Sequence, residues 1–146
     1  MANTTSRKSA NIALHPAEEA TIRAFVVSSK RDRLLTLFGS PKRRREALDA
    51  LNHFADWDAR FARPVDSSAD VLALLRKARA PSECHVMSDS PELDGRDMPL
   101  DEGVRACESY SFASILCCVP DELAFFFDEV AAPRNRILLR RVRGAR

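Results

Sequence analysis

The chain has 146 residues, of which 45% are hydrophobic and 30% charged, and its formal net charge is +2. This length suits one domain with a core of its own, and the composition excludes an intrinsically disordered chain. The longest uncharged apolar run, 112–120, is about half as long as a membrane-spanning helix. We therefore expect no membrane segment.

The start of the chain is polar, carries two basic residues and is followed by no apolar signal segment. We predict a disordered leader over 1–14 and a single α+β domain over 15–146. We therefore expect no secretory signal at this end of the chain.

The four cysteines are Cys84, Cys107, Cys117 and Cys118. Their spacing matches neither a disulfide framework nor a zinc motif. We interpret them as reduced, mostly buried small hydrophobes, as is usual in the cytoplasm.

The first half of the chain contains residues that typically begin and end helices. Pro16 suits the first turn of a helix, and Glu18 and Glu19 are favoured there by the helix dipole. The apolar residues over 34–38 point about a third of a turn away from those over 22–26. One straight helix could not keep both groups on one face, which predicts a break near residues 28–29. Gly39-Ser40-Pro41 then ends one helix and begins the next.

That next helix is predicted over 41–55 and a further one over 67–79, capped by Ser67 and Asp70. After Pro81 the pattern changes to short apolar segments between Pro, Gly, Asp and Ser residues. We predict strands over 84–87, 112–119, 123–128 and 136–142, a loop over 89–99 with a turn at 94–95, and a helix over 99–109.

Helices that precede strands indicate an α+β fold. We expect three to four helices in 15–80, packed on a small, mostly antiparallel sheet of three to four strands in 81–146. One helix lies between these strands. The strand over 112–119 is apolar on both faces, so we place it centrally in the sheet.

The charge is segregated along the chain. Residues 1–63 carry 12 Lys and Arg against 7 Asp and Glu, residues 64–133 carry 5 against 14, and residues 134–146 carry 6 Arg and no acid. Such a distribution favours an acidic partner, a nucleic acid or an acidic protein. The alternative is that the basic ends pack beside the acidic middle.

A basic run opens the predicted helix over 41–55, where four cations oppose the helix dipole. We assign candidate nucleic-acid-binding residues to this run and to the last predicted strand: Lys42, Arg43, Arg44, Arg45, Arg140 and Arg141. The alternatives are ion pairs with the acids of residues 89–102, and the charge that protects an edge strand.

A possible metal site lies on the same helix. Asp49, His53 and Asp56 recur on one helical face together with Glu46. Imidazole and carboxylate ligands suit a divalent transition metal, and a histidine beside a carboxylate can act as a general base. The alternative is an ordinary solvated face.

No catalytic residue and no cofactor can be assigned. Cys84 and His85 are neighbours on a predicted strand and so point to opposite faces. The acidic loop around Gly95 lacks the ligand spacing of an EF-hand, and the chain has no nucleotide-binding or hydrolase motif.

We therefore favour a small non-enzymatic protein that binds an acidic partner, with nucleic acid as the first suspect. One alternative is a metal-assisted hydrolase or nuclease centred on Asp49, His53 and Asp56. Another is a structural or oligomeric module that uses the phenylalanines over 125–127 at an interface. In each case we expect the functional site where the helices meet the sheet.

Overall fold

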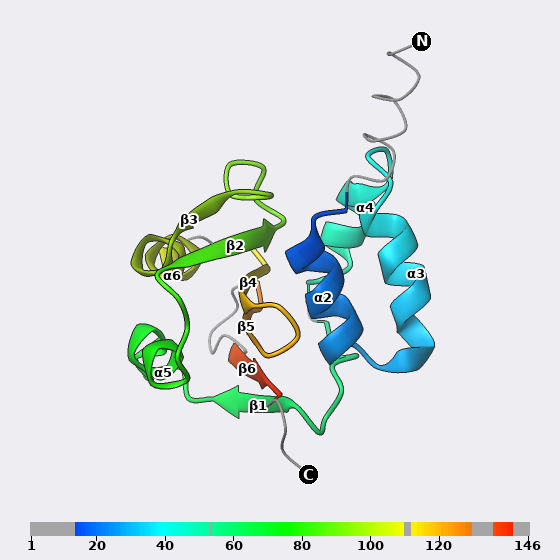
Figure 1. Ribbon diagram of the computed structural model, residues 1–146. Coiled ribbons are helices and arrows are strands. Elements are labelled where there is room, and N and C mark those ends of the chain that lie inside the picture. Colours follow the sequence, from blue (N-terminus) through cyan, green and yellow to red (C-terminus); the bar gives the residue numbers. More distant parts are fainter. Residues whose placement is uncertain (1–13, 53, 110–111, 130–135, 142–146) are drawn as a thin grey trace.

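The computed structural model describes residues 14–52, 54–109, 112–129 and 136–141. Almost all of the predicted leader therefore lies outside the described residues. In the described part, a sheet has helices on both of its faces (Figure 1). One face is covered by α2 (Pro16–Phe25), α3 (Ser28–Phe38) and α4 (Arg44–Asp49), and the other by α5 (Val71–Lys77) and α6 (Leu100–Ser109).

The sheet has six described strands, all antiparallel to their neighbours, in the order β1-β6-β5-β4-β2-β3. The strands are β1 (Ala62–Val65), β2 (Glu83–Ser88), β3 (Asp97–Pro99), β4 (Ser114–Val119), β5 (Leu123–Phe127) and β6 (Arg136–Arg140). The predicted α+β class is confirmed, and β4 is central as expected. The predicted number of strands is too small.

The two missed strands form the edges of the sheet. β1 comes from the half that was predicted to be helical, and β3 from a segment that was predicted to be a loop. Each is short and contains a proline, Pro64 or Pro99, which an edge strand tolerates because one of its sides needs no partner. Neither strand has the apolar alternation that identifies a buried strand.

The central strands alternate between two apolar cores. Phe126 packs with α2, α3 and α4, whereas Phe125 and Phe127 pack with α5 and α6. All three rings are fully buried. An interface built on these phenylalanines is therefore wrong, because their rings hold the layers of this chain together.

Two helix ends in the first half of the chain can be compared with the sequence predictions. The break predicted near residues 28–29 is confirmed, since α2 ends at Phe25 and α3 begins at Ser28. The predicted helix over 41–55 is wrong, because α4 is much shorter. The chain after it runs beside the α2–α3 junction, where Val27 N–H donates to the Asp56 carbonyl (2.9 Å) and Asp58 N–H to the Phe25 carbonyl (2.7 Å). These bonds replace further helical turns.

The cysteines are free and buried, as the sequence predicts. Cys84 lies against α6, where a Cβ atom added to Gly103 would come within 2.6 Å of its Sγ. Glycine inside this helix therefore allows close packing on β2. Burial raises the pKa of Cys84, and that of Cys117, to about 12, so these thiols are poor nucleophiles at neutral pH.

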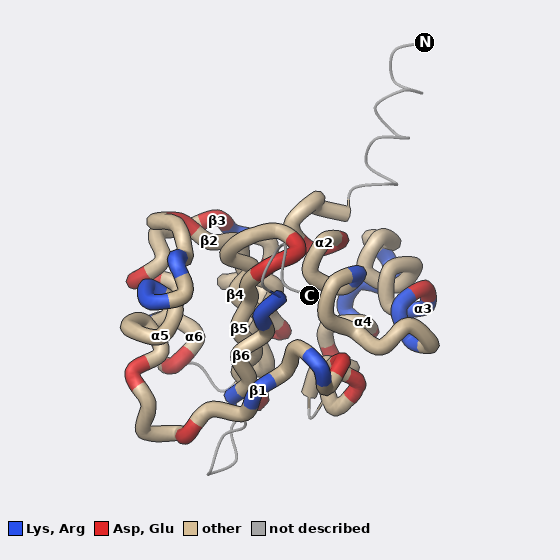
Figure 2. Tube along the Cα trace, turned by 60° about the horizontal axis from the view of Figure 1, so that its bottom comes forward, with Lys and Arg blue, Asp and Glu red and all other residues tan. Residues whose placement is uncertain are grey.

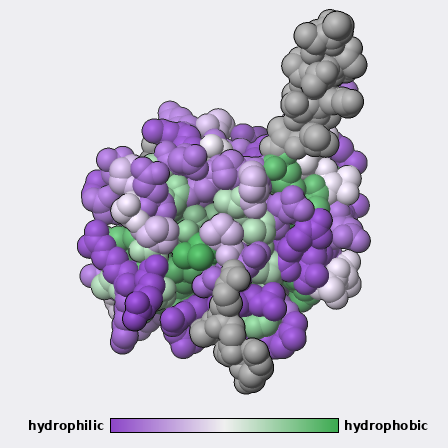
Figure 3. Space-filling model, viewed as in Figure 1, coloured by the Kyte–Doolittle hydropathy of each residue, from purple (hydrophilic) through white to green (hydrophobic). Residues whose placement is uncertain are grey.

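The visible surface in Figure 3 is mostly hydrophilic, with smaller apolar areas between the helical layers. Among the described residues, no helix combines the length and apolarity that a membrane crossing requires.

Candidate metal centre

His85 lies at the meeting point of the first helical layer and the sheet. It belongs to β2 and points towards α2, whereas its neighbour Cys84 belongs to the opposite core. This confirms that the two side chains lie on opposite faces of the strand. His85 is buried, with 4% of the residue exposed, so each of its ring nitrogens requires a partner inside the protein.

Both nitrogens of His85 contact carboxylates. Nε2 lies 2.6 Å from Oε2 of Glu18, and Nδ1 lies 2.7 Å from Oδ1 of Asp97. Glu18 also accepts two hydrogen bonds from Arg44 (2.7 and 2.9 Å), and Arg44 donates two more to Asp94 (both 2.8 Å). The five side chains thus form a chain of alternating charge, which we call the ion-pair chain. It joins α2, α4, β2, the β2–β3 segment and β3.

The ion-pair chain fixes the protonation of its members. Burial alone would raise the pKa of Glu18, but the hydrogen bonds from His85 and Arg44 lower it below its ordinary value. Burial alone would lower the pKa of His85, yet the bonds to Glu18 and Asp97 raise it. The arrangement therefore favours an ionised Glu18 beside an imidazolium.

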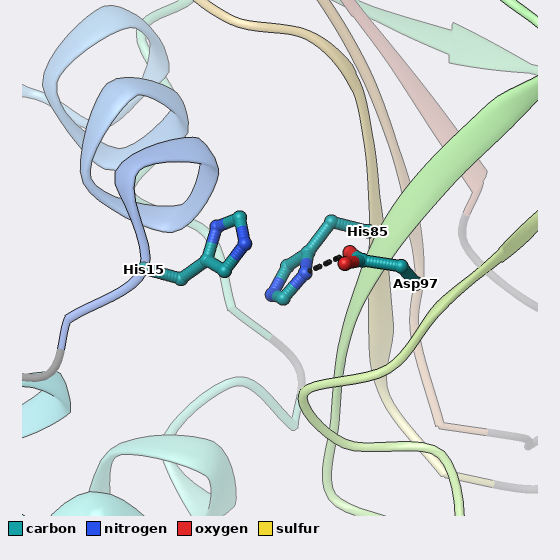
Figure 4. Close-up of side chains that lie close together, drawn as sticks. All are labelled: His15, His85 and Asp97. Carbon is teal, nitrogen blue, oxygen red and sulfur yellow. Dashed lines mark hydrogen bonds and ion pairs between the residues drawn. The ribbon is translucent and has the colours of Figure 1, made fainter.

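A second histidine stacks on this imidazolium (Figure 4). The rings of His15 and His85 have centroids 3.8 Å apart and are inclined by 21°. His15 precedes α2, and its Nδ1 accepts the N–H of Ala17 (3.0 Å), so the side chain caps the helix. In the neutral ring the proton is then on Nε2.

The two histidines border a cleft of about 330 Å³ between α2, the α3–α4 turn and the β2–β3 turn. Glu18 and Arg44 contribute polar atoms, and Phe38, Gly39 and Pro41 contribute apolar surface. Gly95 has a φ of +80°, the left-handed conformation that glycine adopts without strain. The turn predicted at 94–95 thus closes one side of the cleft.

His15, His85 and Asp97 can together hold a metal ion. Each offers one ligand atom, and these atoms all lie within 4.8 Å of one another. Ligands of a tetrahedral ion lie roughly 3.4 Å apart. Nδ1 of His85 and Oδ1 of Asp97 are only 2.7 Å apart and must separate, and the His15 ring must turn out of its stack on His85 to direct a nitrogen at the ion. The exposed Asp97 side chain and the half-buried His15 leave room for this movement. Glu18 would then accept the remaining N–H of His85, the usual support of a metal-bound imidazole.

The predicted metal set lies elsewhere. Asp49 is exposed on α4, and Asp56 lies in the segment beside the α2–α3 junction. His53 lies outside the described residues. The site over Asp49, His53 and Asp56 therefore stays a prediction.

Three of the four residues in the basic run over 42–45 form ion pairs within the fold. Besides Arg44 in the ion-pair chain, Arg45 contacts Asp89 (2.6 Å) and Arg43 contacts Glu46 (3.2 Å). This is the predicted alternative, in which the acids of residues 89–102 pair with the run. Lys42 is exposed.

Arg140 and Arg141 lie away from the basic run. They lie at the end of β6 and directly after it, near the β1 edge, whereas Arg44 and Arg45 contact the segment between β2 and β3 at the opposite edge. Nucleic-acid binding through these arginines stays a proposal.

Sequence reasoning missed Glu18 because an acid in the first turn of a helix has an ordinary explanation. A signal was present, since Glu18, Ile22 and Phe25 are spaced i, i+4 and i+7 and so share one helical face. An acid in an apolar stripe indicates a buried charge with a partner. His15 and Asp97 had no comparable signal.

No family model, curated protein or solved structure matches this chain. The function is therefore inferred from the geometry of the described residues.

Proposed function

We propose that the protein binds one divalent transition-metal ion through His15, His85 and Asp97. The observation that supports this is the convergence of three ligand atoms within 4.8 Å, beside a cleft. Two imidazoles and a carboxylate suit zinc and its first-row neighbours better than calcium or magnesium, which prefer oxygen ligands.

The buried carboxylate of Glu18 is the second support. It already orients His85 through Nε2, which leaves Nδ1 on the side of Asp97. Outer hydrogen bonds of this kind commonly change metal affinity by about 10- to 100-fold. Glu18 would therefore position the ligand without touching the ion.

Three protein ligands leave one coordination position for water or substrate. This position would face the cleft, where the Arg44 guanidinium is already paired with Glu18 and Asp94. A metal ion lowers the pKa of bound water and polarises a substrate oxygen, so metal-assisted hydrolysis is the reaction class that suits the site.

Two costs limit the affinity. The ion must displace the proton that His85 shares with Asp97, so binding should strengthen as pH rises. An ion on Nε2 of His15 also requires the proton on Nδ1, and this removes the acceptor of Ala17 N–H. Loss of such a cap costs about 1 kcal/mol.

Cobalt(II) titration of purified protein, followed by visible absorption and calorimetry, tests the proposal. The variant His15→Asn removes a ligand nitrogen but keeps a side chain that can cap α2. We expect one ion per chain in the wild type and an affinity at least about tenfold lower in His15→Asn and in Asp97→Asn.

The matched control is His53→Asn, because His53 is the third histidine of the chain. It should bind cobalt as the wild type does. A wild type that binds no ion, or a loss of binding in His53→Asn with none in His15→Asn, would contradict the proposal. The second result would favour the site predicted around Asp49, His53 and Asp56.

A further inference from the structure

A cleft of about 420 Å³ lies at the opposite edge of the sheet, over β1 and β6. Its lining includes three arginines and an aromatic ring: Arg60, Arg63, Arg140 and Phe61. The basic stretches beside β1 and β6 are visible in Figure 2. We call this the arginine cleft.

Strand register places two of these arginines on one face. Arg63 of β1 is opposite Leu138 of β6, and Arg140 is two residues beyond Leu138. Residues two apart on a strand share a face, and such diagonal neighbours across two strands lie about 7–8 Å apart. The backbone N–H of Arg140 donates to the Phe61 carbonyl (3.0 Å), which holds β6 against the entry to β1.

Phe61 orders two further guanidinium groups. Arg141 lies 4.4 Å and Arg60 4.9 Å from the centroid of its ring. A guanidinium on an aromatic ring keeps its N–H donors in its own plane, where they can reach an anion. Arg141 also donates to the Ala24 carbonyl of α2 (3.3 Å), so it is directed towards the first helical layer and is not among the residues that line the cleft.

The acids near this cleft leave two arginines unpaired. Asp58 forms an ion pair with Arg60 (2.6 Å). Within the described ranges, no ion pair involves Arg63 or Arg140, and both residues are exposed. Exposed, unpaired guanidinium groups retain their full capacity for phosphate.

We propose that the arginine cleft binds phosphate groups, those of a nucleic-acid strand or of a free phosphorylated ligand. Arg63 and Arg140 contact the phosphates, and Arg60, stacked on Phe61, flanks them. Phosphate is favoured over carboxylate because three arginines line the cleft, and phosphate offers more acceptor oxygens than a carboxylate does. The inference is independent of the metal site, which lies at the other edge of the sheet.

The test is fluorescence anisotropy with a labelled single-stranded oligonucleotide, measured over a series of salt concentrations. The double variant Arg63→Ala with Arg140→Ala removes the two unpaired cations. We expect its affinity to fall at least about tenfold and the slope of log K against log salt to fall by about 1.4, if each arginine neutralises one phosphate.

The matched control removes two cations from the basic run, by Lys42→Ala with Arg43→Ala, and should lower the affinity less than about twofold. Competition with pyrophosphate and with polyglutamate identifies the ligand chemistry. If pyrophosphate displaces the oligonucleotide from the wild type but not from the Arg63 and Arg140 variant, the cleft recognises phosphate. The ligand is then a free phosphorylated molecule.

Three results would overturn the proposal. The first is a wild type that binds neither the oligonucleotide nor pyrophosphate. The second is polyglutamate that competes as well as unlabelled oligonucleotide at equal charge. The third is a larger loss in the Lys42 and Arg43 variant than in the Arg63 and Arg140 variant. Circular dichroism of each variant excludes unfolding as the cause.

Discussion

The two edges of the sheet use arginine in opposite ways. At the β2–β3 edge, Arg44 is held by Glu18 and Asp94 inside the ion-pair chain. At the β1–β6 edge, Arg63 and Arg140 are exposed and form no ion pair with the described residues. The densest run of cations in the sequence is therefore the less available one. A basic motif indicates a binding surface only after its acidic partners in the fold are known.

The difference arises from contacts between distant segments. Arg44 and Asp94 are 50 residues apart, and Glu18 and His85 are 67 residues apart. Glu18 and His85 are buried, and Arg44 and Asp94 are partly buried. An unpaired charge is costly in such surroundings, and a paired one fixes the packing of its segments. Arg63 and Arg140 at the β1–β6 edge are exposed to water, so they need no acidic partner within the protein.

The largest effect is expected at the centre of the ion-pair chain. Glu18→Gln removes the negative charge that lies between Arg44 and His85, and breaking a buried ion pair costs about 3 kcal/mol. Urea denaturation of the metal-free protein measures the free energy of unfolding. Glu19→Gln, which changes an exposed partner of Arg23, should cost less than about 0.5 kcal/mol. Equal losses in both variants would refute a structural role for Glu18.

A smaller contrast is expected between arginines of the two edges. Arg44→Gln leaves Glu18 and Asp94 without their guanidinium and should cost about 2 kcal/mol. Arg140→Gln removes an exposed charge and should change the free energy of unfolding by less than about 0.5 kcal/mol. A larger loss of stability in Arg140→Gln than in Arg44→Gln would contradict the claim that the two edges use arginine differently.

The free energy of unfolding should depend on pH through Glu18 and His85 of the ion-pair chain. The pKa of Glu18 is lowered in the folded protein, so its contribution is present above the ordinary value of 4.5 and is lost as pH falls through the folded value. The pKa of His85 is raised, so its contribution is present below 6.5 and is lost as pH rises through the folded value. Urea midpoints should therefore decline on both sides of mildly acidic pH, and Glu18→Gln should flatten both declines. An unchanged profile in Glu18→Gln would assign the pH dependence to other groups.

The smallest effect is expected at the surface pair of Arg45 and Asp89. More than half of the Arg45 side chain is exposed, so Arg45→Gln should cost about 0.5 kcal/mol at low salt and less at high salt. Thermal unfolding at two salt concentrations measures this. A loss as large as that of Arg44→Gln would show that exposure does not separate the two arginines.

The sequence predicted those parts of the fold that local patterns determine. The α2–α3 break, the central strand β4 and the buried cysteines follow from apolar periodicity and residue type. The edges β1 and β3 could not be predicted, because hydrogen bonds to a neighbouring strand define them and their own side chains alternate weakly. The predicted meeting point of helices and sheet does contain a candidate site, although it is built from His15, His85 and Asp97.

The most direct test of the metal site is a crystal of the full chain grown with zinc, examined by anomalous diffraction at the zinc edge. We expect one strong peak about 2.0–2.2 Å from a nitrogen of His15, Nδ1 of His85 and an oxygen of Asp97, with Glu18 still bonded to Nε2. A strong peak at His53, or a zinc-saturated crystal with no peak between His15 and His85, would contradict it.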